Sequence, residues 1–165
     1  DLHFQEYWVA RGARDEVKSV RYEGAEQARP APGVLEGIGR AEAIIVCPSN
    51  PVASIGPILA VPGVSQALGE RRERVVGISP IVGGAPLRGM ADRLMPVVGL
   101  EVSAFGAAAA YRELLGAWVI DGRDDSLIPR IEAALGVRVA VTDTIMVDDR
   151  AAETLARVTL DALDE

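Results

Sequence analysis

Short apolar segments alternate along this chain with segments whose apolar residues recur at helical spacing, and that alternation limits the folds open to it. Residues 43–47 and 75–78 are apolar and uncharged, as expected of strands buried in a parallel sheet. Residues 118–120 and 137–141 continue the series. Strands that alternate with helices form parallel sheets joined by right-handed crossovers. The sequence therefore predicts an α/β fold, a three-layer Rossmann-like parallel sheet with flanking helices.

Helical segments are expected between and around these strands. They cover residues 34–38, 55–69, 90–98, 107–115, 126–135 and 148 to about 163. Pro62 and Gly63 are expected to break or bend the second of them, because proline removes a helical hydrogen bond. Gly136 is suited to end the fifth helix, and Asp148 is suited to cap the last. Residues 17–22 alternate apolar with polar side chains and predict one further, half-exposed strand.

The length of the chain fits one domain. At 165 residues it can bury about two-thirds of its unfolded surface, and no repeat or linker divides it. No apolar run approaches the ~20 residues that span a bilayer. Residues 1–5 lack the basic and apolar regions of a signal peptide, and they lack an initiator Met. We therefore expect a protein that contacts no membrane, with residues 1–165 forming part of a longer domain.

Charge and cysteine content narrow the classes of partner. The net charge is −7, and Lys18 is the one lysine among 17 basic residues. Proteins that bind nucleic acid are usually basic, so no nucleic-acid partner is expected. An anionic small ligand remains compatible with this charge, since backbone amides, a few arginines and a metal ion act locally. The single cysteine, Cys47, excludes an intramolecular disulfide framework and a cysteine-rich zinc site, and it fits a reducing cytoplasm.

Three polar loops are expected at the carboxyl ends of strands, which is where open parallel sheets bind ligands. They are residues 48–54, 79–84 and 142–144. Ser54 is a good N-cap, and Pro57 fits the first turn of the helix that follows. The free backbone donors of such a helix start would suit a phosphate group. Ordinary turn chemistry without a ligand is the alternative for loop 48–54.

Single residues in the other loops each allow a functional and a structural interpretation. Gly83 and Gly84 would let a ligand approach the backbone closely, or they form a plain turn. Arg88 could reach a phosphate or lie in solvent. Asp143 follows Thr142 and could position a metal ion or a hydroxyl group, or it could close its own loop.

Other polar residues are expected to have structural roles. Asp121 and the pair Asp124–Asp125 fit the start of a helix better than a ligand site. Cys47 lies at the end of an apolar strand and is expected in the core. His3 is the only histidine, and its place near a terminus excludes a convincing Ser-His-Asp triad.

Several longer strings are specific enough to compare with a known family. They are Phe4-Gln5-Glu6-Tyr7-Trp8-Val9, Glu23-Gly24-Ala25, Arg29-Pro30-Ala31-Pro32-Gly33-Val34, Pro48-Ser49-Asn50-Pro51, Ser54-Ile55-Gly56-Pro57-Ile58-Leu59, Ser79-Pro80-Ile81-Val82-Gly83-Gly84 and Thr142-Asp143-Thr144-Ile145-Met146. In order and spacing, the chain resembles the C-terminal half of a 2-phospho-L-lactate transferase, a family of coenzyme F420 biosynthesis. One departure is Leu87-Arg88-Gly89-Met90-Ala91, where the family has Val-Lys-Gly-Pro-Ala; Arg for Lys keeps the charge but changes its hydrogen-bond geometry.

The resemblance implies a reaction and a set of binding residues. A ribityl hydroxyl of the deazaflavin Fo attacks a guanosine-diphospho donor carrying a lactyl or enolpyruvyl group, GMP leaves, and Mg²⁺ assists. The implied substrate-binding residues are Ser49, Asn50, Ser54, Ser79, Pro80, Val82, Gly83, Gly84, Arg88, Thr142 and Asp143. The catalytic base and the metal ligands are expected upstream, in a glycine-rich N-terminal half with metal-binding aspartates. A homodimer is expected, because an absent half would leave an apolar sheet edge that needs cover.

A related group of proteins is the alternative. Its members share this sheet but act as non-catalytic, nucleotide-sugar-binding regulators of cell-wall metabolism. They tend to carry Gly-Ser-x-x-Thr-Ser in the first loop, whereas Pro48-Ser49-Asn50-Pro51 favours the transferase. An unrelated doubly wound binding module is a third possibility. Release of GMP from the donor in the presence of Fo would separate enzyme from regulator.

Overall fold

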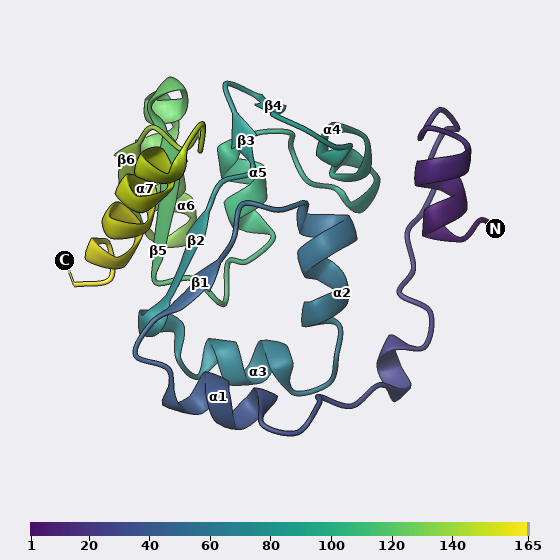
Figure 1. Cartoon of the computed structure of the whole chain (residues 1–165), viewed down its shortest axis with the longest axis horizontal. Coiled ribbons are helices and arrows are strands. Elements are labelled where there is room, and N and C mark those ends of the chain that lie inside the picture. Colours follow the sequence, from purple (N-terminus) through teal and green to yellow (C-terminus); the bar gives the residue numbers. More distant parts are fainter. Residues whose placement is uncertain (165) are drawn as a thin grey trace.

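A four-stranded parallel sheet forms the centre of the computed structural model, which describes residues 1–164 (Figure 1). Its strands are β1 (Ile44–Val46), β2 (Val75–Ile78), β5 (Ala117–Asp121) and β6 (Arg138–Thr142), in the spatial order β1-β2-β5-β6. Each neighbouring pair is parallel. The four strands predicted from apolar runs are therefore confirmed, as is the α/β Rossmann-like architecture.

One face of this sheet carries most of the helices and most of the core. The helices there are α2 (Gly56–Leu59), α3 (Val64–Gly69), α5 (Ala104–Ala109) and α6 (Ile128–Leu135), and α1 (Val34–Arg40) packs on α3. Trp118 is fully buried at the centre of this core, where its indole N–H donates to the carbonyl of Ala104 at 3.2 Å. Gly77 of β2 makes room for that ring, because a Cβ at this position would collide with it.

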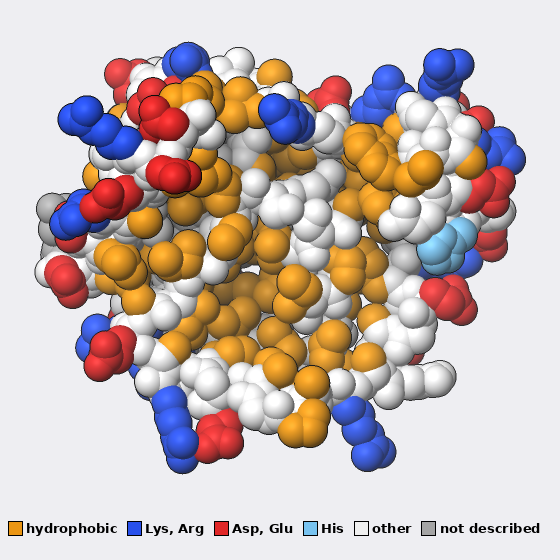
Figure 2. Space-filling model, viewed as in Figure 1, with side chains coloured by type: hydrophobic (Ala, Val, Ile, Leu, Met, Phe, Trp, Pro, Cys, Tyr) orange, Lys and Arg blue, Asp and Glu red, His pale blue; other side chains and the backbone are white. Residues whose placement is uncertain are grey.

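The opposite face carries a single helix among the described residues, α7 (Asp149–Asp161). It packs on β2 and β6, and its Leu155 is buried against the sheet. β1 lies beyond this cover, at the edge of the sheet. Figure 2 shows hydrophobic side chains gathered over the middle of the molecule, between α7 and α2, with charged side chains mainly around the rim.

Several predicted helix boundaries are confirmed. Gly136 ends α6 with a φ of 63°, and the Asp148 carboxylate caps α7 by accepting from the amide of Ala151 at 2.8 Å. Pro62 and Gly63 separate α2 from α3 as expected. Within residues 1–164, no helix combines the length and the apolar character that crossing a membrane requires.

The strand predicted over residues 17–22 is wrong. The segment is extended but pairs with no strand, and it belongs to an N-terminal arm that runs beside the helices, away from the sheet (Figure 1). The arm contains two short helical turns, Glu6–Ala10 and Ala25–Gln27. The alternation in residues 17–22 reflects half-burial, since Val17 and Val20 pack against the core.

Two predicted helices are shorter than expected. The segment 90–98 divides into α4 (Ala91–Leu94) and a 3₁₀ turn at Pro96–Val98, because Pro96 cannot donate a helical hydrogen bond. The segment predicted over 107–115 begins earlier, at Ala104, where the Ser103 hydroxyl accepts from the amide of Gly106 at 3.0 Å.

The remaining short elements were not predicted. A two-stranded hairpin, β3 (Ile81–Val82) and β4 (Ala85–Pro86), follows β2. Gly83 and Gly84 form its tip, with φ values of 58° and 81° that favour glycine. Single 3₁₀ segments lie at Arg72–Arg74 and Gly122–Leu127.

Candidate functional site

The carboxyl ends of the four strands meet at one edge of the sheet. Because the strands are parallel, the loops that follow Val46, Ile78, Asp121 and Thr142 all leave from this edge. These loops contain the residues that the sequence singles out. The edge is therefore the candidate site, in keeping with the usual place of ligands in open parallel sheets.

The loop after β1 is organised by Asn50. Its side-chain oxygen accepts from the amides of Val52 at 2.9 Å and Ala53 at 3.0 Å. Asn50 thus caps the wide helical turn Pro51–Ile55, and the expectation that Ser54 is the N-cap is wrong. Asn50 is the N-cap, and not Ser54, because the helical turn begins at Pro51, a residue that suits the first helical position.

Because Asn50 caps this turn, fewer backbone amides are free to bind a ligand than the sequence suggested. The amides of Val52 and Ala53 are already hydrogen-bonded to Asn50, so they are not free as the sequence suggested. The side chain of Ser49 is half-buried and that of Ser54 is exposed. In this loop, polar side chains are therefore better placed than helix-start amides to meet a ligand.

The loop after β2 is held by its own serine. Ser79 is buried; its hydroxyl donates to the carbonyl of Ile81 at 2.8 Å and accepts from the amide of Ile81 at 3.2 Å. Pro80 is half-buried between them, and Val82 is buried in β3. These three residues shape the turn that leads to the glycine tip.

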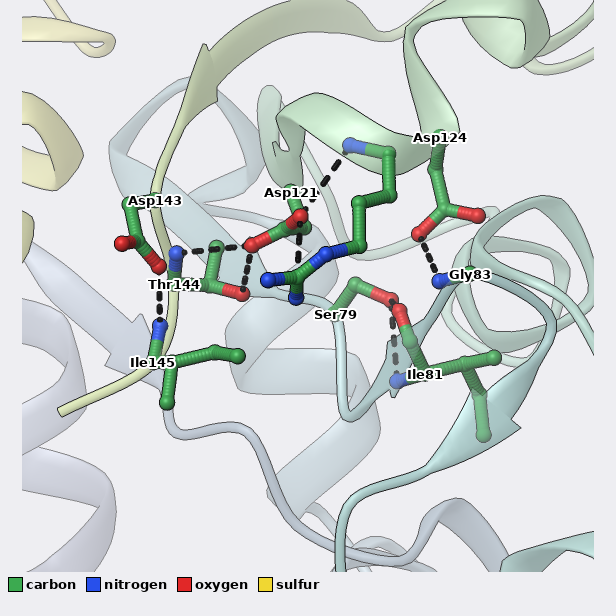
Figure 3. Close-up of polar contacts among 9 residues, drawn as sticks. Ser79, Ile81, Gly83, Asp121, Asp124, Asp143, Thr144 and Ile145 are labelled. Atoms are coloured by element: carbon green, nitrogen blue, oxygen red, sulfur yellow. Dashed lines mark hydrogen bonds and ion pairs between the residues drawn. The ribbon is translucent and has the colours of Figure 1, made fainter. Parts of the chain in front are cut away.

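The glycine tip is anchored to the loop after β5. The amide of Gly83 donates to the carboxylate of Asp124 at 2.9 Å, and Asp124 itself is buried (Figure 3). Gly84 is exposed, and a Cβ there would meet nothing within 4 Å. Arg88 is also exposed, beyond β4. The tip is thus fixed at Gly83 and open to an incoming group at Gly84.

Asp121 joins the ends of β5 and β6. Asp121 is only 3% exposed. One of its carboxylate oxygens accepts hydrogen bonds from the amide of Thr144 at 3.1 Å and from the Thr144 hydroxyl at 3.2 Å. The other oxygen accepts from the amide of Arg123 at 3.0 Å and lies 3.6 Å from its guanidinium (Figure 3). Burial by itself would raise the pKa of Asp121, but these hydrogen bonds and the guanidinium lower it overall.

The loop after β6 closes on itself. The Asp143 carboxylate accepts from the amide of Ile145 at 2.9 Å, which is the structural alternative considered for this residue. Asp143 remains exposed, whereas Thr142 is half-buried at the end of β6. Asp143 therefore keeps one side of its carboxylate toward solvent at the edge of the site.

The structure brings loops 79–84 and 142–144 together through the two aspartates of the segment 121–124. Loop 48–54 follows β1, the strand next to β2, and its capping hydrogen bonds are formed within the loop. The sequence assigned helix-start roles to Asp121 and Asp124; Asp121 does cap the turn that follows, but it also binds Thr144. Contacts between loops this far apart in sequence have no local pattern that would reveal them.

Arg123 is a candidate site residue that the sequence did not single out. Its side chain is 58% exposed, and a Cβ placed on Gly83 would lie 3.8 Å from its Cδ. The guanidinium thus lies beside Asp121, and the aliphatic part of the side chain lies near Gly83. The position of Arg123 two residues after a capping aspartate at a strand end was the available signal. A cation here can receive an anionic substrate group.

Cys47 is exposed, so its predicted place in the core is wrong. It follows the edge strand β1, whereas α7 packs on β2 and β6. The apolar character of the preceding strand predicted burial on both faces, but only one face of β1 is packed.

The candidate edge holds no preformed metal cluster. Up to Asp164, no group of three or more His, Cys, Asp or Glu side chains is arranged to bind a metal ion. Both carboxylate oxygens of Asp121 and one of Asp124 already accept hydrogen bonds. The residues described here thus do not by themselves form a Mg²⁺ site.

Comparison with known proteins gives the family. The family model for 2-phospho-L-lactate transferase CofD matches residues 1–162. The "Phosphoenolpyruvate transferase" of Streptomyces griseus is 48% identical over 165 residues, covering 99% of this chain and 52% of the relative. The "2-phospho-L-lactate transferase" of Methanopyrus kandleri is 41% identical over 172 residues, covering 100% and 52%, and that of Methanosarcina mazei is 37% identical over 161 residues, covering 98% and 52%.

The chain spans about half the length of these curated relatives. Even so, the match runs through nearly every residue of the chain and includes all the strand-end loops described above. This extent of similarity shows that the chain belongs to the 2-phospho-L-lactate transferase family.

Proposed function

We propose that this chain forms part of an enzyme of coenzyme F420 biosynthesis. The enzyme transfers a phospholactyl or phosphoenolpyruvyl group from a guanosine-diphospho donor to the deazaflavin Fo and releases GMP. The family match over residues 1–162 is the observation that carries this proposal. Relatives with both names are similar to the chain, and the 48% identity to a phosphoenolpyruvate transferase makes the enolpyruvyl donor the first to test.

The reaction needs alignment and charge neutralisation more than covalent help from the protein. The ribityl hydroxyl gives up its proton as its oxygen forms a bond to the phosphorus that carries the lactyl or enolpyruvyl group, and the phosphoanhydride bond to GMP breaks. GMP leaves with the electron pair of that bond, so negative charge grows on its phosphate. Arg123 and the exposed Arg88 are the cations of this edge that we assign to that charge.

The guanosine diphosphate is proposed to lie across loops 48–54 and 79–84. The support is the half-buried Ser49, the exposed Ser54 and the open glycine tip at Gly84. Ser79, Pro80 and Val82 would act by holding the turn that presents the tip. Thr142 and Asp143 would border the same edge from β6.

Mg²⁺ is the proposed cofactor. When bound, it would neutralise the diphosphate charge. The described residues contain no metal cluster, so its ligands would come from the diphosphate and from protein outside residues 1–164. No catalytic base is assigned within this chain.

Substituting Asn50 by Asp tests the nucleotide site without removing the helix cap. Asp caps a helix start as well as Asn does, but it adds a negative charge where the diphosphate is proposed. In a protein of full family length, N50D should weaken GDP binding about tenfold or more, measured by calorimetry. Gln27→Glu adds the same charge at an exposed turn in the N-terminal arm and should leave GDP affinity unchanged. Equal affinities for the two variants would contradict the assignment.

The transfer itself is tested with Fo and each donor in turn. We expect Fo-dependent release of GMP with at least one of the two donors. Nucleotide binding without GMP release would support a non-catalytic regulator instead. The transferase proposal would then fail even if the nucleotide site is correct.

Assembly and compartment complete the proposal. We propose a cytoplasmic homodimer that acts on small molecules and uses neither nucleic acid nor a membrane. Exposed apolar residues such as Leu87 and Val98 support a further interface. Light scattering of a protein of full family length should give twice the mass of one chain.

A further inference from the structure

The glycine tip belongs to a hairpin that is too short to fix its own position. β3 and β4 contain two residues each and pair only with one another, so they are not part of the parallel sheet. A two-stranded hairpin by itself is marginally stable at best in water. β3 is buried, but Gly83 and Gly84 beyond it are exposed. The tip therefore depends on a contact from outside the hairpin.

Asp124 provides that contact and makes no other with its carboxylate in the part of the chain described. The carboxylate accepts from the amide of Gly83 at 2.9 Å, and Asp124 is only 5% exposed (Figure 3). No ion pair joins it to an arginine or lysine of residues 1–164. A buried negative charge at an edge that receives phosphate is unfavourable, because like charges repel. Its place is explained by the hydrogen bond to the tip.

The amide of Gly84 is the group that this tether leaves open. Among residues 1–164 it has no hydrogen-bond partner, and a Cβ on Gly84 would meet nothing within 4 Å. The neighbouring amide of Gly83 is already bonded to Asp124. Exposed backbone N–H groups in turns are suited to bind phosphate oxygens. The tip thus presents one free donor next to one tethered donor.

We propose that Asp124 is a positioning residue for the donor diphosphate. Through Gly83 it holds the Gly84 amide where a phosphate oxygen is received, and Asp124 itself touches no substrate. This inference rests on the proposed function. Phosphate oxygens are charged both before and during the transfer, so the amide binds the ground state and the transition state about equally. Binding of that kind lowers the KM for the donor and leaves kcat unchanged.

Asp124→Ala removes the tether and a negative charge together, and these two changes have opposite effects on GDP. Loss of the charge alone would tighten GDP binding, whereas loss of the tether weakens it. In a protein of full family length, D124A should weaken GDP binding about tenfold, measured by calorimetry. The KM for the donor should rise by a similar factor, while kcat and the KM for Fo change by less than about threefold.

Asp124→Asn is the rescue variant, because its side-chain oxygen can still accept from the Gly83 amide. D124N should bind GDP at least as tightly as the unchanged protein. Asp125→Ala removes an exposed carboxylate at the next position and should leave GDP affinity unchanged. Equal affinities for D124A and D125A, or a D124N variant as weak as D124A, would overturn the inference and leave the proposed function intact. An unchanged protein that binds no GDP would overturn both.

Hydrogen exchange resolved to single amides provides a second measurement that needs no variant. In the unchanged protein without nucleotide, the Gly84 amide should exchange faster than the Gly83 amide, which is bonded to Asp124. Saturating GDP should slow exchange at Gly84 about tenfold or more, because a phosphate oxygen then accepts from it. An unchanged rate at Gly84 with GDP bound would overturn the inference, even if D124A fails to fold.

Discussion

At the scale of single residues, the buried hydroxyl of Tyr111 lowers the stability of the folded state. Its hydroxyl is buried and has no hydrogen-bond partner among residues 1–164. Burial, with a smaller contribution from Tyr22, raises the pKa of Tyr111 far above its usual value. The hydroxyl is therefore neutral at pH 7.

Tyr111→Phe should therefore leave the free energy of unfolding unchanged or raise it by up to about 1 kcal/mol, because it removes a buried polar group without a partner. Tyr22→Phe provides the contrast: the Tyr22 hydroxyl donates to the carbonyl of Val52 at 2.5 Å, so its loss should cost about 1 kcal/mol. Urea unfolding at pH 7 measures both. A Y111F variant less stable than Y22F would disagree with this account.

Asp121 makes stability depend on pH. Its pKa is lowered in the fold, so its carboxylate stabilises the native state at neutral pH. That contribution is lost as the pH falls below the ordinary aspartate value of about 4 toward the lowered pKa. Asp121→Asn should cost about 1–3 kcal/mol at pH 7 and less at pH 3. Urea titrations at both pH values test this, with the exposed Asp125→Asn as control.

At the scale of elements, the contact between β2 and Trp118 depends on a glycine. A methyl group on Gly77 would collide with the Trp118 ring, so Gly77→Ala should destabilise the protein by about 1–3 kcal/mol. Gly37→Ala, within α1, meets nothing within 4 Å and should stabilise by about 0.5–1 kcal/mol. Thermal unfolding separates the two. Equal melting temperatures would show that the packing of β2 against Trp118 accommodates an added methyl group.

Elements also show where sequence reasoning succeeds. Residues 75–78 and 118–120 were predicted as strands because burial on both faces leaves a continuous apolar run. Asp148 and Gly136 were predicted as helix ends because their roles depend on local backbone geometry alone. Residues 17–22 show the opposite case, since alternation reports half-burial but does not reveal whether a partner strand exists.

At the scale of the whole molecule, Arg72 ties distant segments together below the sheet. Its side chain donates to the carbonyl of Leu115 at 2.6 Å and to those of Leu135 and Gly136 at 3.3 Å each. These bonds join the segment before β2 to the turn before β5 and to the end of α6. They close the edge of the sheet opposite the candidate site.

Arg72→Ala should lower the free energy of unfolding by about 1–3 kcal/mol, because it leaves three carbonyls without this donor. Arg74→Ala removes an exposed arginine two residues away and should change it by less than about 0.5 kcal/mol. Chemical unfolding of both variants gives the comparison. A similar loss in both would mean that charge, not these bonds, matters here.

Some features of the candidate site could be predicted from the sequence, and others could be seen only in the structure. The loops could be placed at one edge in advance, because parallel strands bring their carboxyl ends together. The anchoring of Gly83 by Asp124, and of Thr144 by Asp121, could not, because each joins residues far apart in sequence. Arg123 was missed for the same reason: its neighbours in space come from other loops.

The sequence by itself determined the strands, most helix boundaries and the family, since these depend on local propensity, apolar runs and motifs in order. Only the tertiary structure decided which polar groups remain free to bind a ligand and which strand lies at the less covered edge of the sheet. Asn50 accepts hydrogen bonds from amides that the sequence suggested were free, and Cys47 is exposed at the end of the edge strand β1, whereas α7 packs on β2 and β6. Both outcomes depend on which groups lie next to each other in space, and the order of residues along the chain does not reveal this.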